Sequence, residues 1–178
     1  KSVVIPGVLP GTWKLIVLTD ANGKQGETDE TNNTQTLDIT LSAPDLTVTG
    51  VTAPATAAVS QTINVSWTVH NGGPGAAPAD WNDAVFFSSK NTYDGTATFL
   101  GSFSAAPKTP VAATGEYTLS GTVTLPNVAT GDWFLLVVAD WQGAQPESDE
   151  TNNTAFSALA LGAPDLTISA ATAPSIAA

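Results

Sequence analysis

The chain contains no cysteine and no methionine, and it has a single histidine among its 178 residues. Without cysteine it can form neither a disulfide framework nor a thiolate metal site. Ser–His–Asp and Cys–His catalysis also lack support, because His70 has no cysteine or evident acidic partner. We interpret His70, beside the Asn71-Gly72-Gly73 turn, as a surface turn residue, and we predict no catalytic residue.

Basic residues are scarce as well. There are five, all of them lysine, against 16 acidic residues, and the net charge is −11. This balance excludes the basic surface that nucleic-acid binding requires, and it argues against docking on anionic lipid. No apolar run approaches the roughly 18–20 residues of a membrane span, so no membrane insertion is expected within this segment. The abundance of Thr, Ala, Gly, Ser and Val is typical of a bacterial or archaeal surface protein.

The main positive feature is an internal repeat. Residues 1–58 recur as residues 121–178 without a gap, so Trp13 returns as Trp133 at a constant offset of 120 residues. A fixed period of domain size indicates a tandem array. We therefore expect the main partners to be neighbouring repeats, or copies of the same protein in a fibre.

Strand patterns dominate each period. Apolar and polar residues alternate over 62–69 and 117–125, and shorter patterns occupy 46–51, 84–87 and 98–100. The run 133–138 is apolar on both faces, as a central strand is, and the last strand is clearest over 36–41. About seven short strands per ~120 residues, without a helical period, predict an all-β, immunoglobulin-like antiparallel β-sandwich.

The repeat also predicts the domain boundaries. Residues 1–42 are expected to close a preceding repeat, 43–162 to form a complete repeat, and 163–178 to begin the following one. The junction is short and contains proline, which favours a restricted, rod-like connection. Each repeat would add roughly 35–45 Å to such a rod. The unpaired edges of the half-repeat are expected to be covered by the rest of the array or by strands from neighbouring copies.

Half of the acidic residues lie in two equivalent loops, 20–33 and 140–153. Four carboxylates within one short loop repel each other unless a cation lies among them, and Ca²⁺ prefers such oxygen ligands. The absence of His and Cys from both loops argues against zinc. The alternative is a solvated acidic turn shaped by its own side chains. The candidate calcium ligands of the two loops are Asp20, Asn22, Glu27, Asp29, Glu30, Asn33, Asp140, Gln142, Glu147, Asp149, Glu150 and Asn153.

The five tryptophans fall into two groups. Trp13 and Trp133 occupy the same position of the repeat and are expected in the core, as is Trp67. Trp81 and Trp141 are the candidates for exposed aromatic side chains. A tryptophan beside a calcium loop can stack on a sugar ring, so a carbohydrate-binding module of a secreted protein is the alternative function.

Three motifs resemble those of a known family. Pro44-Asp45-Leu46 opens the repeat, Val69-His70-Asn71-Gly72-Gly73 follows the second strand, and Asp140…Glu147-Ser148-Asp149-Glu150-Thr151-Asn152-Asn153 closes it. Together they are similar to the CARDB domain, the cell-adhesion-related domain of bacterial and archaeal surface proteins. The resemblance spans essentially the whole 120-residue period.

The resemblance implies an immunoglobulin-like sandwich, tandem repetition, an extracellular location and an adhesive or binding role without catalysis. It also supports calcium in the closing turn. Members often carry a second acidic segment in mid-domain, but residues 88–95 contain only one Asp and one Lys, which puts a second cation site in doubt. We expect a non-enzymatic structural or adhesive repeat of a large microbial surface protein or extracellular fibre. Surface glycans and other surface proteins are further candidate partners.

Overall fold

The structure is a computed structural model that describes residue 3 and residues 10–172. Nearly all of its regular structure is strand, with one short 3₁₀ helix over Ala106–Lys108. The strands are β1 (Gly11–Leu18), β2 (Thr34–Leu41), β3 (Leu46–Thr52), β4 (Thr56–Ala58), β5 (Thr62–Asn71), β6 (Asn82–Ser88), β7 (Thr98–Ser104), β8 (Glu116–Thr124), β9 (Gly131–Val138) and β10 (Thr154–Gly162).

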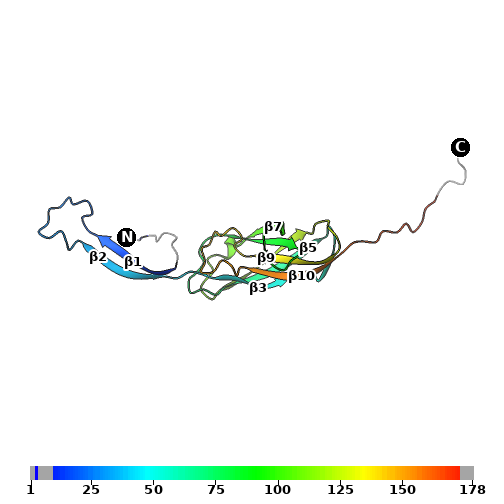
Figure 1. The fold of residues 1–178 in the computed structure, drawn as a ribbon, viewed down its shortest axis with the longest axis horizontal. Helices are drawn as coiled ribbons and strands as arrows, with labels where there is room; N and C mark the ends of the chain where they lie inside the picture. Colours follow the sequence, from blue (N-terminus) through cyan, green and yellow to red (C-terminus); the bar gives the residue numbers. More distant parts are fainter. Residues whose placement is uncertain (1–2, 4–9, 173–178) are drawn as a thin grey trace, which may run out of the picture.

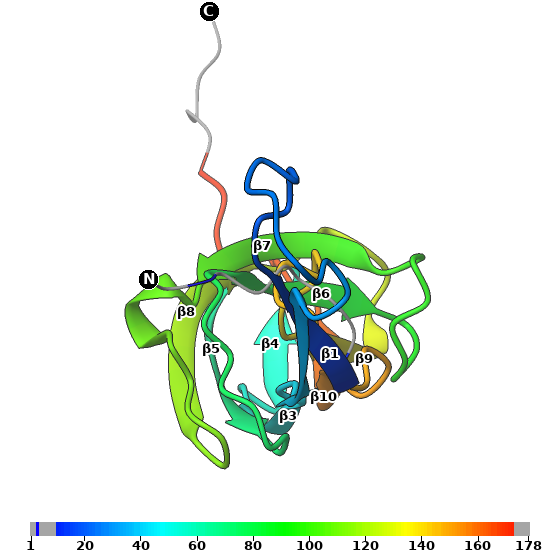
Figure 2. The ribbon, with the colours of Figure 1, turned by 90° about the vertical axis from the view of Figure 1, so that its left-hand side faces the viewer.

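Strands β3 to β10 form a two-layered sandwich. One sheet has the order β4-β10-β9-β6-β7 and the other has the order β3-β5-β8. Seen end-on, β5 and β8 lie on one side of the molecule and β6 and β9 on the other (Figure 2). All pairings within the sandwich are antiparallel except that of β10 with β4. The all-β, immunoglobulin-like prediction is therefore confirmed.

The core lies between the two sheets and is built from the alternating apolar residues of the predicted strands. Trp67 of β5 is buried there, as predicted, and its ring meets Phe103 of β7 edge-on with centroids 5.2 Å apart. Phe103 also lies over Gly121 of β8, where an added Cβ would overlap the aromatic ring. Glycine at this position therefore allows edge strands of the two sheets to approach closely.

Local irregularities account for the features that alternation did not predict. The apolar residues Leu46, Val48 and Val51 break strict alternation because a β-bulge shifts the register between Val48 and Gly50. Strand β4 was not expected, because its three residues Thr56–Ala58 are small and carry no alternating pattern. The 3₁₀ turn over Ala106–Lys108 lies between the alternating patterns and contains Pro107.

Strands β1 and β2 form a separate hairpin with the same pairing as β9 and β10. Gly11 pairs with Leu41, just as Gly131 pairs with Leu161 one repeat later. The hairpin and the extended segment 163–172 leave opposite ends of the sandwich (Figure 1). The chain therefore enters the sandwich at one end and leaves it at the other.

The two hairpins differ in what covers them. Strand β9 lies between β10 and β6, whereas within the described residues β1 pairs with β2 alone. Trp133 is half-buried and stacks on Phe87 of β6 with centroids 4.6 Å apart. Trp13 is 44% exposed, so its prediction as a core residue is wrong for this chain. The reason is that, in the part of the chain that the structure describes, no counterpart of β6 lies beside β1.

Candidate functional site

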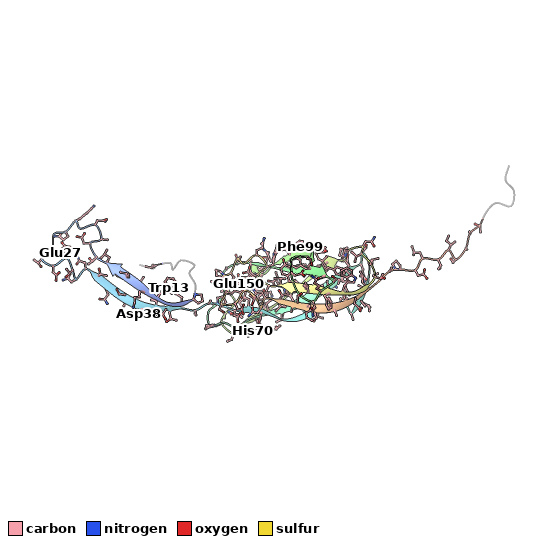
Figure 3. The ribbon with its side chains drawn as sticks, in the orientation of Figure 1. Trp13, Glu27, Asp38, His70, Phe99 and Glu150 are labelled. Carbon is pink, nitrogen blue, oxygen red and sulfur yellow. The ribbon has the colours of Figure 1, made fainter. Side chains whose placement is uncertain are left out.

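The predicted acidic turn connects β9 to β10 at the end of the sandwich where residues 42–45 enter. Figure 3 shows Glu150 at this end, nearest the hairpin, and Glu27 at the far tip of the hairpin. The two copies of the turn therefore lie at the same end of two equivalent hairpins, β1–β2 and β9–β10.

Local sequence determines the first half of the turn. Asp140 has a left-handed backbone (φ 41°), and its carboxylate accepts the backbone N–H groups of Ala144 at 2.9 Å and Gln145 at 2.6 Å. Asp20 has the same φ and accepts the N–H groups of Lys24 and Gln25 at 3.0 and 2.8 Å. Because the two copies agree in different surroundings, their own residues impose this conformation.

The second half of the turn is also held by its own acids. Asp149 accepts both the N–H and the hydroxyl of Thr151, at 2.9 and 2.6 Å, and these bonds lower the pKa of Asp149. Glu150 accepts the N–H of Glu147 at 3.0 Å. Several of the carboxylates therefore stabilise the conformation of the loop itself. This agrees with the alternative prediction of an acidic turn that is shaped by its own side chains.

Glu147 points inward and has a long-range partner. One of its oxygens accepts the N–H of Leu46, and the other accepts the Asn153 amide at 2.9 Å. Burial raises the pKa of Glu147 to about 8, and the nearby charges of Glu150 and Asp140 add to the shift. In the hairpin copy the equivalent Glu27 is exposed, and Asn33 donates to Glu30 at 3.2 Å instead.

The difference between the copies comes from the opening segment, residues 43–46. Ser148 donates its N–H and hydroxyl to the Pro44 carbonyl at 2.9 and 3.2 Å. Asn152 donates to Asp45 at 2.9 Å, and Asp45 donates its N–H to Asn71 at 3.0 Å. The closing turn of the domain therefore binds the first residues of the same domain.

Beside the closing turn lies a hollow of about 320 Å³, whose lining includes Asp140, Glu150, Asn153, Tyr93 and Trp141. Asn153 is 5% exposed, and its Oδ1 has no hydrogen-bond partner among the described residues. Burial raises the pKa of Asp140, and the charges of Glu150 and Asp83 add to the rise. The hollow therefore presents two carboxylates and a buried amide oxygen, all of them hard oxygen donors.

Only some of the predicted calcium ligands of the 140–153 loop lie close together in the structure. Asp140, Glu150 and Asn153 come together around the hollow, whereas Glu147 binds the opening segment, Asp149 binds Thr151 and Gln142 is exposed. Nowhere in residue 3 and residues 10–172 do three acidic or imidazole side chains gather as a metal-binding group. A cation in the hollow would therefore use the amide oxygen besides the two carboxylates. The candidate ligands of the first copy lie in the hairpin turn, where nearly every residue is exposed: Asp20, Asn22, Glu27, Asp29, Glu30 and Asn33.

The prediction that Trp81 is exposed is wrong. Trp81 is 2% exposed, and its indole N–H donates to the Tyr117 hydroxyl at 3.0 Å. Asp83 in turn accepts the Tyr117 hydroxyl at 2.8 Å and the Trp67 indole at 2.7 Å. Burial raises the pKa of both Asp83 and Tyr117. Asp80 is exposed and binds Thr109, so Asp80 and Asp83 are not a carboxylate pair facing a cleft.

Trp141, the other predicted exposed tryptophan, is only half-buried and joins an aromatic cluster on the outer face of the five-stranded sheet. Its ring lies 6.1 Å from Phe86 and 5.6 Å from Phe99, and Phe86 lies 4.7 Å from Tyr93. Phe99 and Tyr93 are exposed. Sequence reasoning missed this cluster, because Tyr93 belongs to a loop whose position could not be predicted. Ala21 stands at the equivalent of Trp141 in the hairpin copy, so the turn does not require an aromatic residue there.

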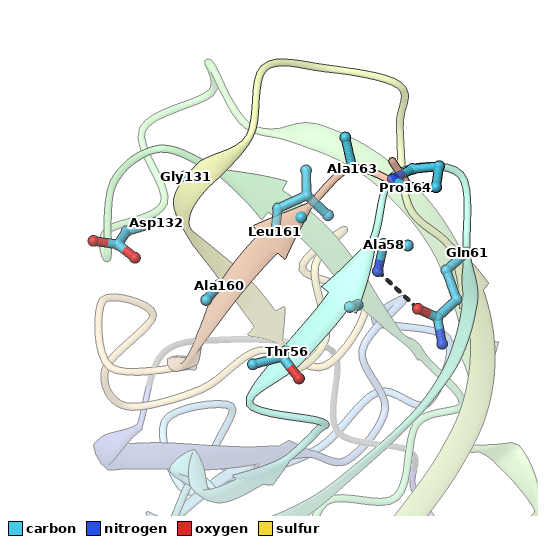
Figure 4. Close-up of a pocket in the computed structure, with 11 residues that line it drawn as sticks. Thr56, Ala58, Gln61, Gly131, Asp132, Ala160, Leu161, Ala163 and Pro164 are labelled. Atoms are coloured by element: carbon cyan, nitrogen blue, oxygen red, sulfur yellow. Dashed lines mark hydrogen bonds between the residues drawn. The ribbon is translucent and has the colours of Figure 1, made fainter. Parts of the chain in front are cut away.

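A larger hollow of about 670 Å³ lies at the opposite end of the sandwich, where the chain leaves it (Figure 4). Its lining includes Thr56, Gln61, Leu161 and Pro164, and Asp132 is its only charged residue. The Gln61 side chain accepts the Ala58 N–H at 2.7 Å across this hollow. The lining is small and mostly apolar, and it brings together no group of reactive side chains.

Among residue 3 and residues 10–172 we find no helix with the length and hydropathy that crossing a bilayer requires. No curated protein matches the chain.

A CARDB domain from Pyrococcus furiosus, crystallised in complex with di-metal ions, is similar over 71% of this chain and 100% of its own, with a TM-score of 0.51 and 19% identity. A solution structure of that domain gives a TM-score of 0.48 at 19% identity, covering 68% of this chain and 97% of its own. A beta-glucosidase from Listeria innocua is similar over 73% of this chain and only 18% of its own, at 12% identity and a TM-score of 0.43.

At these sequence identities the structural similarity supports the fold alone. We base that support on the crystallised CARDB domain, whose TM-score is 0.51. The CARDB family model matches residues 43–157, from the segment before β3 into β10. Its match agrees with the opening, middle and closing motifs of the sequence. The chain therefore belongs to the CARDB family, a family of cell-adhesion-related domains.

Proposed function

We propose that this chain is a non-enzymatic structural or adhesive part of a large microbial surface protein or extracellular fibre, with calcium stiffening its closing turn. Membership of an adhesion-related family supports the adhesive role and a location at the bacterial or archaeal surface. The observation that carries the structural role is the repeat itself, which continues on both sides of the complete sandwich.

In this proposal the β1–β2 hairpin closes a preceding repeat, of which residues 1–42 are a part, and residues 163–178 begin a following one. The shared pairing register of the two hairpins supports this assignment. So does exposure, because Val17 is 51% exposed whereas its equivalent Val137 is fully buried. The partners are accordingly neighbouring repeats or other copies of the protein.

The calcium part of the proposal concerns the hollow beside the closing turn. Asp140, Glu150 and the Asn153 amide oxygen would hold the ion. The positive charge would favour the ionised form of Asp140, whose pKa is raised by burial and, to a smaller extent, by the nearby carboxylates. The Pyrococcus furiosus CARDB domain was crystallised with di-metal ions, which makes a metal in this family credible. Glu147 is not assigned to the ion, because it binds the opening segment.

The test is thermal unfolding of the full chain in millimolar Ca²⁺ and in EDTA. Calcium should raise the melting temperature, because a ligand that binds only the folded state stabilises it. The double variant Asp140→Asn/Glu150→Gln should lose this shift. The matched control Asp20→Asn/Glu30→Gln, at the same positions of the exposed hairpin turn, should retain it. Equal melting curves of the unmodified chain in both buffers would remove calcium from the proposal while leaving the structural role untouched.

The alternative function is that of a carbohydrate-binding module, and the outer-face aromatic cluster favours it. Exposed aromatic rings offer stacking surfaces for sugars, and Trp141 lines the acidic hollow as well as the cluster. Binding on a glycan array that Trp141→Ala abolishes and Phe156→Ala retains would favour this alternative. A chain that binds no polysaccharide would leave the structural role as the better account.

A further inference from the structure

The amide of Asn153 lies between the acidic hollow and the start of the sandwich. Asn153 is 5% exposed and lines the hollow, and its Oδ1 has no hydrogen-bond partner in the described part of the chain. Its Nδ2 donates to one oxygen of Glu147 at 2.9 Å. The other oxygen of Glu147 accepts the N–H of Leu46, the first residue of β3. Two side chains therefore connect the hollow to the opening strand.

The unpartnered oxygen of Asn153 indicates what the hollow binds. A buried polar atom without a partner costs free energy, which a bound group recovers. An amide oxygen accepts either a hydrogen-bond donor or a cation, and the carboxylates of Asp140 and Glu150 on the same hollow favour a cation. This observation supports a cation independently of the number of acidic residues in the turn.

An asparagine at this position of the turn pairs with either of two acids. Asn153 donates to Glu147, whereas its counterpart in the hairpin, Asn33, donates to Glu30 at 3.2 Å. Glu30 corresponds to Glu150, which lines the hollow. The pairing with Glu147 therefore leaves the carboxylate of Glu150 available to a cation, and the other pairing would engage it.

The rest of the turn holds the same opening segment. Ser148 donates its N–H and hydroxyl to the Pro44 carbonyl at 2.9 and 3.2 Å, and the Asn152 amide donates to Asp45 at 2.9 Å. These partners lie in the residues that lead from the hairpin into β3. Because all the contacts come from one loop, a change in the conformation of that loop would weaken them together.

We propose that Asn153 and Glu147 couple occupation of the hollow by a cation to the docking of residues 43–46, so that calcium stiffens the joint between the hairpin and the sandwich. This inference rests on the proposed calcium site. With its oxygen held toward a cation, Asn153 keeps its nitrogen toward Glu147, and Glu147 keeps its second oxygen for Leu46. Because coupling between two sites is reciprocal, docking of the opening segment should also strengthen cation binding.

The test measures amide hydrogen exchange of the full chain in millimolar Ca²⁺ and in EDTA, at one pH and under conditions of local opening. Calcium should slow exchange of the Leu46 N–H by at least about fivefold. The control is the Val59 N–H, which donates to Gly162 at 2.9 Å at the opposite end of the sandwich and should change by less than about twofold. Equal slowing of both amides would be general stabilisation and would overturn the proposal.

The variant Glu147→Gln breaks the connection without changing a proposed ligand of the ion. Glutamine has one oxygen where Glu147 uses two, so it cannot accept both N–H groups in the same way. Calcium should still raise the melting temperature of this variant but should no longer slow the Leu46 N–H. The matched control Glu27→Gln, in the exposed hairpin turn, should retain both effects. Slowing that persists in Glu147→Gln would also overturn the proposal.

These outcomes separate the coupling from the calcium site. A higher melting temperature in calcium with no effect on the Leu46 N–H would remove the coupling and leave calcium in the proposed function. Equal melting curves in the two buffers would overturn both. The comparison of Leu46 with Val59 uses the unmodified chain, so it decides the matter even where Glu147→Gln does not fold.

Discussion

Asn71 is fully buried at the end of β5 and connects the loops that meet there. Its carbonyl oxygen accepts the N–H groups of Asp45 and Gly73 at 3.0 and 3.1 Å, and its amide donates to the carbonyls of Gly75 and Ala112 at 2.8 and 3.0 Å. Four backbone groups thus depend on one side chain in a place that water does not reach. Losing such an amide leaves buried polar groups unpaired.

We therefore expect Asn71→Ala to lower the free energy of unfolding by about 2–4 kcal/mol. Asn64→Ala is the matched control, because Asn64 lies on the same strand with its side chain exposed, and it should change stability by less than about 0.5 kcal/mol. Urea denaturation of both variants measures the difference. Similar losses in the two variants would show that the buried network contributes little.

At the residue scale, the role of a side chain could be predicted where its hydrogen-bond partners are close to it in the sequence. The Asp140 and Asp149 turns follow from residues within five positions of each acid. Glu147 could not be predicted in this way, because its partner Leu46 lies 101 positions away along the chain. Trp81 was misjudged for the same reason, since Tyr117, which binds its indole, belongs to another strand.

At the scale of strands, period-two alternation predicted most of the sandwich because each sheet has one face toward the core. The uninterrupted apolar run 133–138 predicted β9 as a central strand, and the pairing of β9 with both β10 and β6 confirms this. Alternation could not predict β4, which is too short, or the bulge in β3. The pairing order of the sheets also depends on contacts between distant segments, which no local pattern contains.

The repeat provides an internal comparison of one strand in two surroundings. Val137 of β9 is fully buried, and Val17 occupies the same position of β1 with half of its side chain exposed. Val137→Ala should therefore cost about 1.5–3 kcal/mol of unfolding free energy through lost burial and a residual cavity. Val17→Ala in the same chain should cost less than about 0.5 kcal/mol.

Chemical denaturation of the two valine variants measures both values. The same pair can be repeated in a chain extended at its N-terminus by a copy of residues 43–120, which precede the second copy of the hairpin in this sequence. If these residues complete a sandwich around β1, Val17→Ala should become as costly as Val137→Ala. A Val17→Ala cost that stays small in that longer chain would count against the assignment of residues 1–42 to a preceding repeat.

For the molecule as a whole, the joint between the hairpin and the sandwich is short and firmly bound. Gly75 donates its N–H to the Ala43 carbonyl at 3.1 Å, and Gly73 lies so close that an added Cβ would be 2.5 Å from that carbonyl oxygen. The segment 42–45 is therefore packed against the domain that it introduces, in agreement with the restricted connection expected from its proline.

This arrangement predicts that successive repeats keep a nearly fixed direction. In small-angle scattering, a chain with two complete repeats should behave as a rod, with roughly 35–45 Å added by the second repeat. Gly73→Val should broaden the distribution of lengths, because its side chain would push the connecting segment away from the loop. A compact two-repeat particle would contradict the rod.

Opposite points of entry and exit have a mechanical consequence. A pull on the two ends of the complete repeat acts on the start of β3 and on the end of β10, and both strands run from the entry end to the exit end. Their ladder hydrogen bonds lie across the strand direction, so tension would shear whole rows at once rather than peel them one by one. Tandemly linked domains of this kind would therefore unfold abruptly under force, one domain at a time.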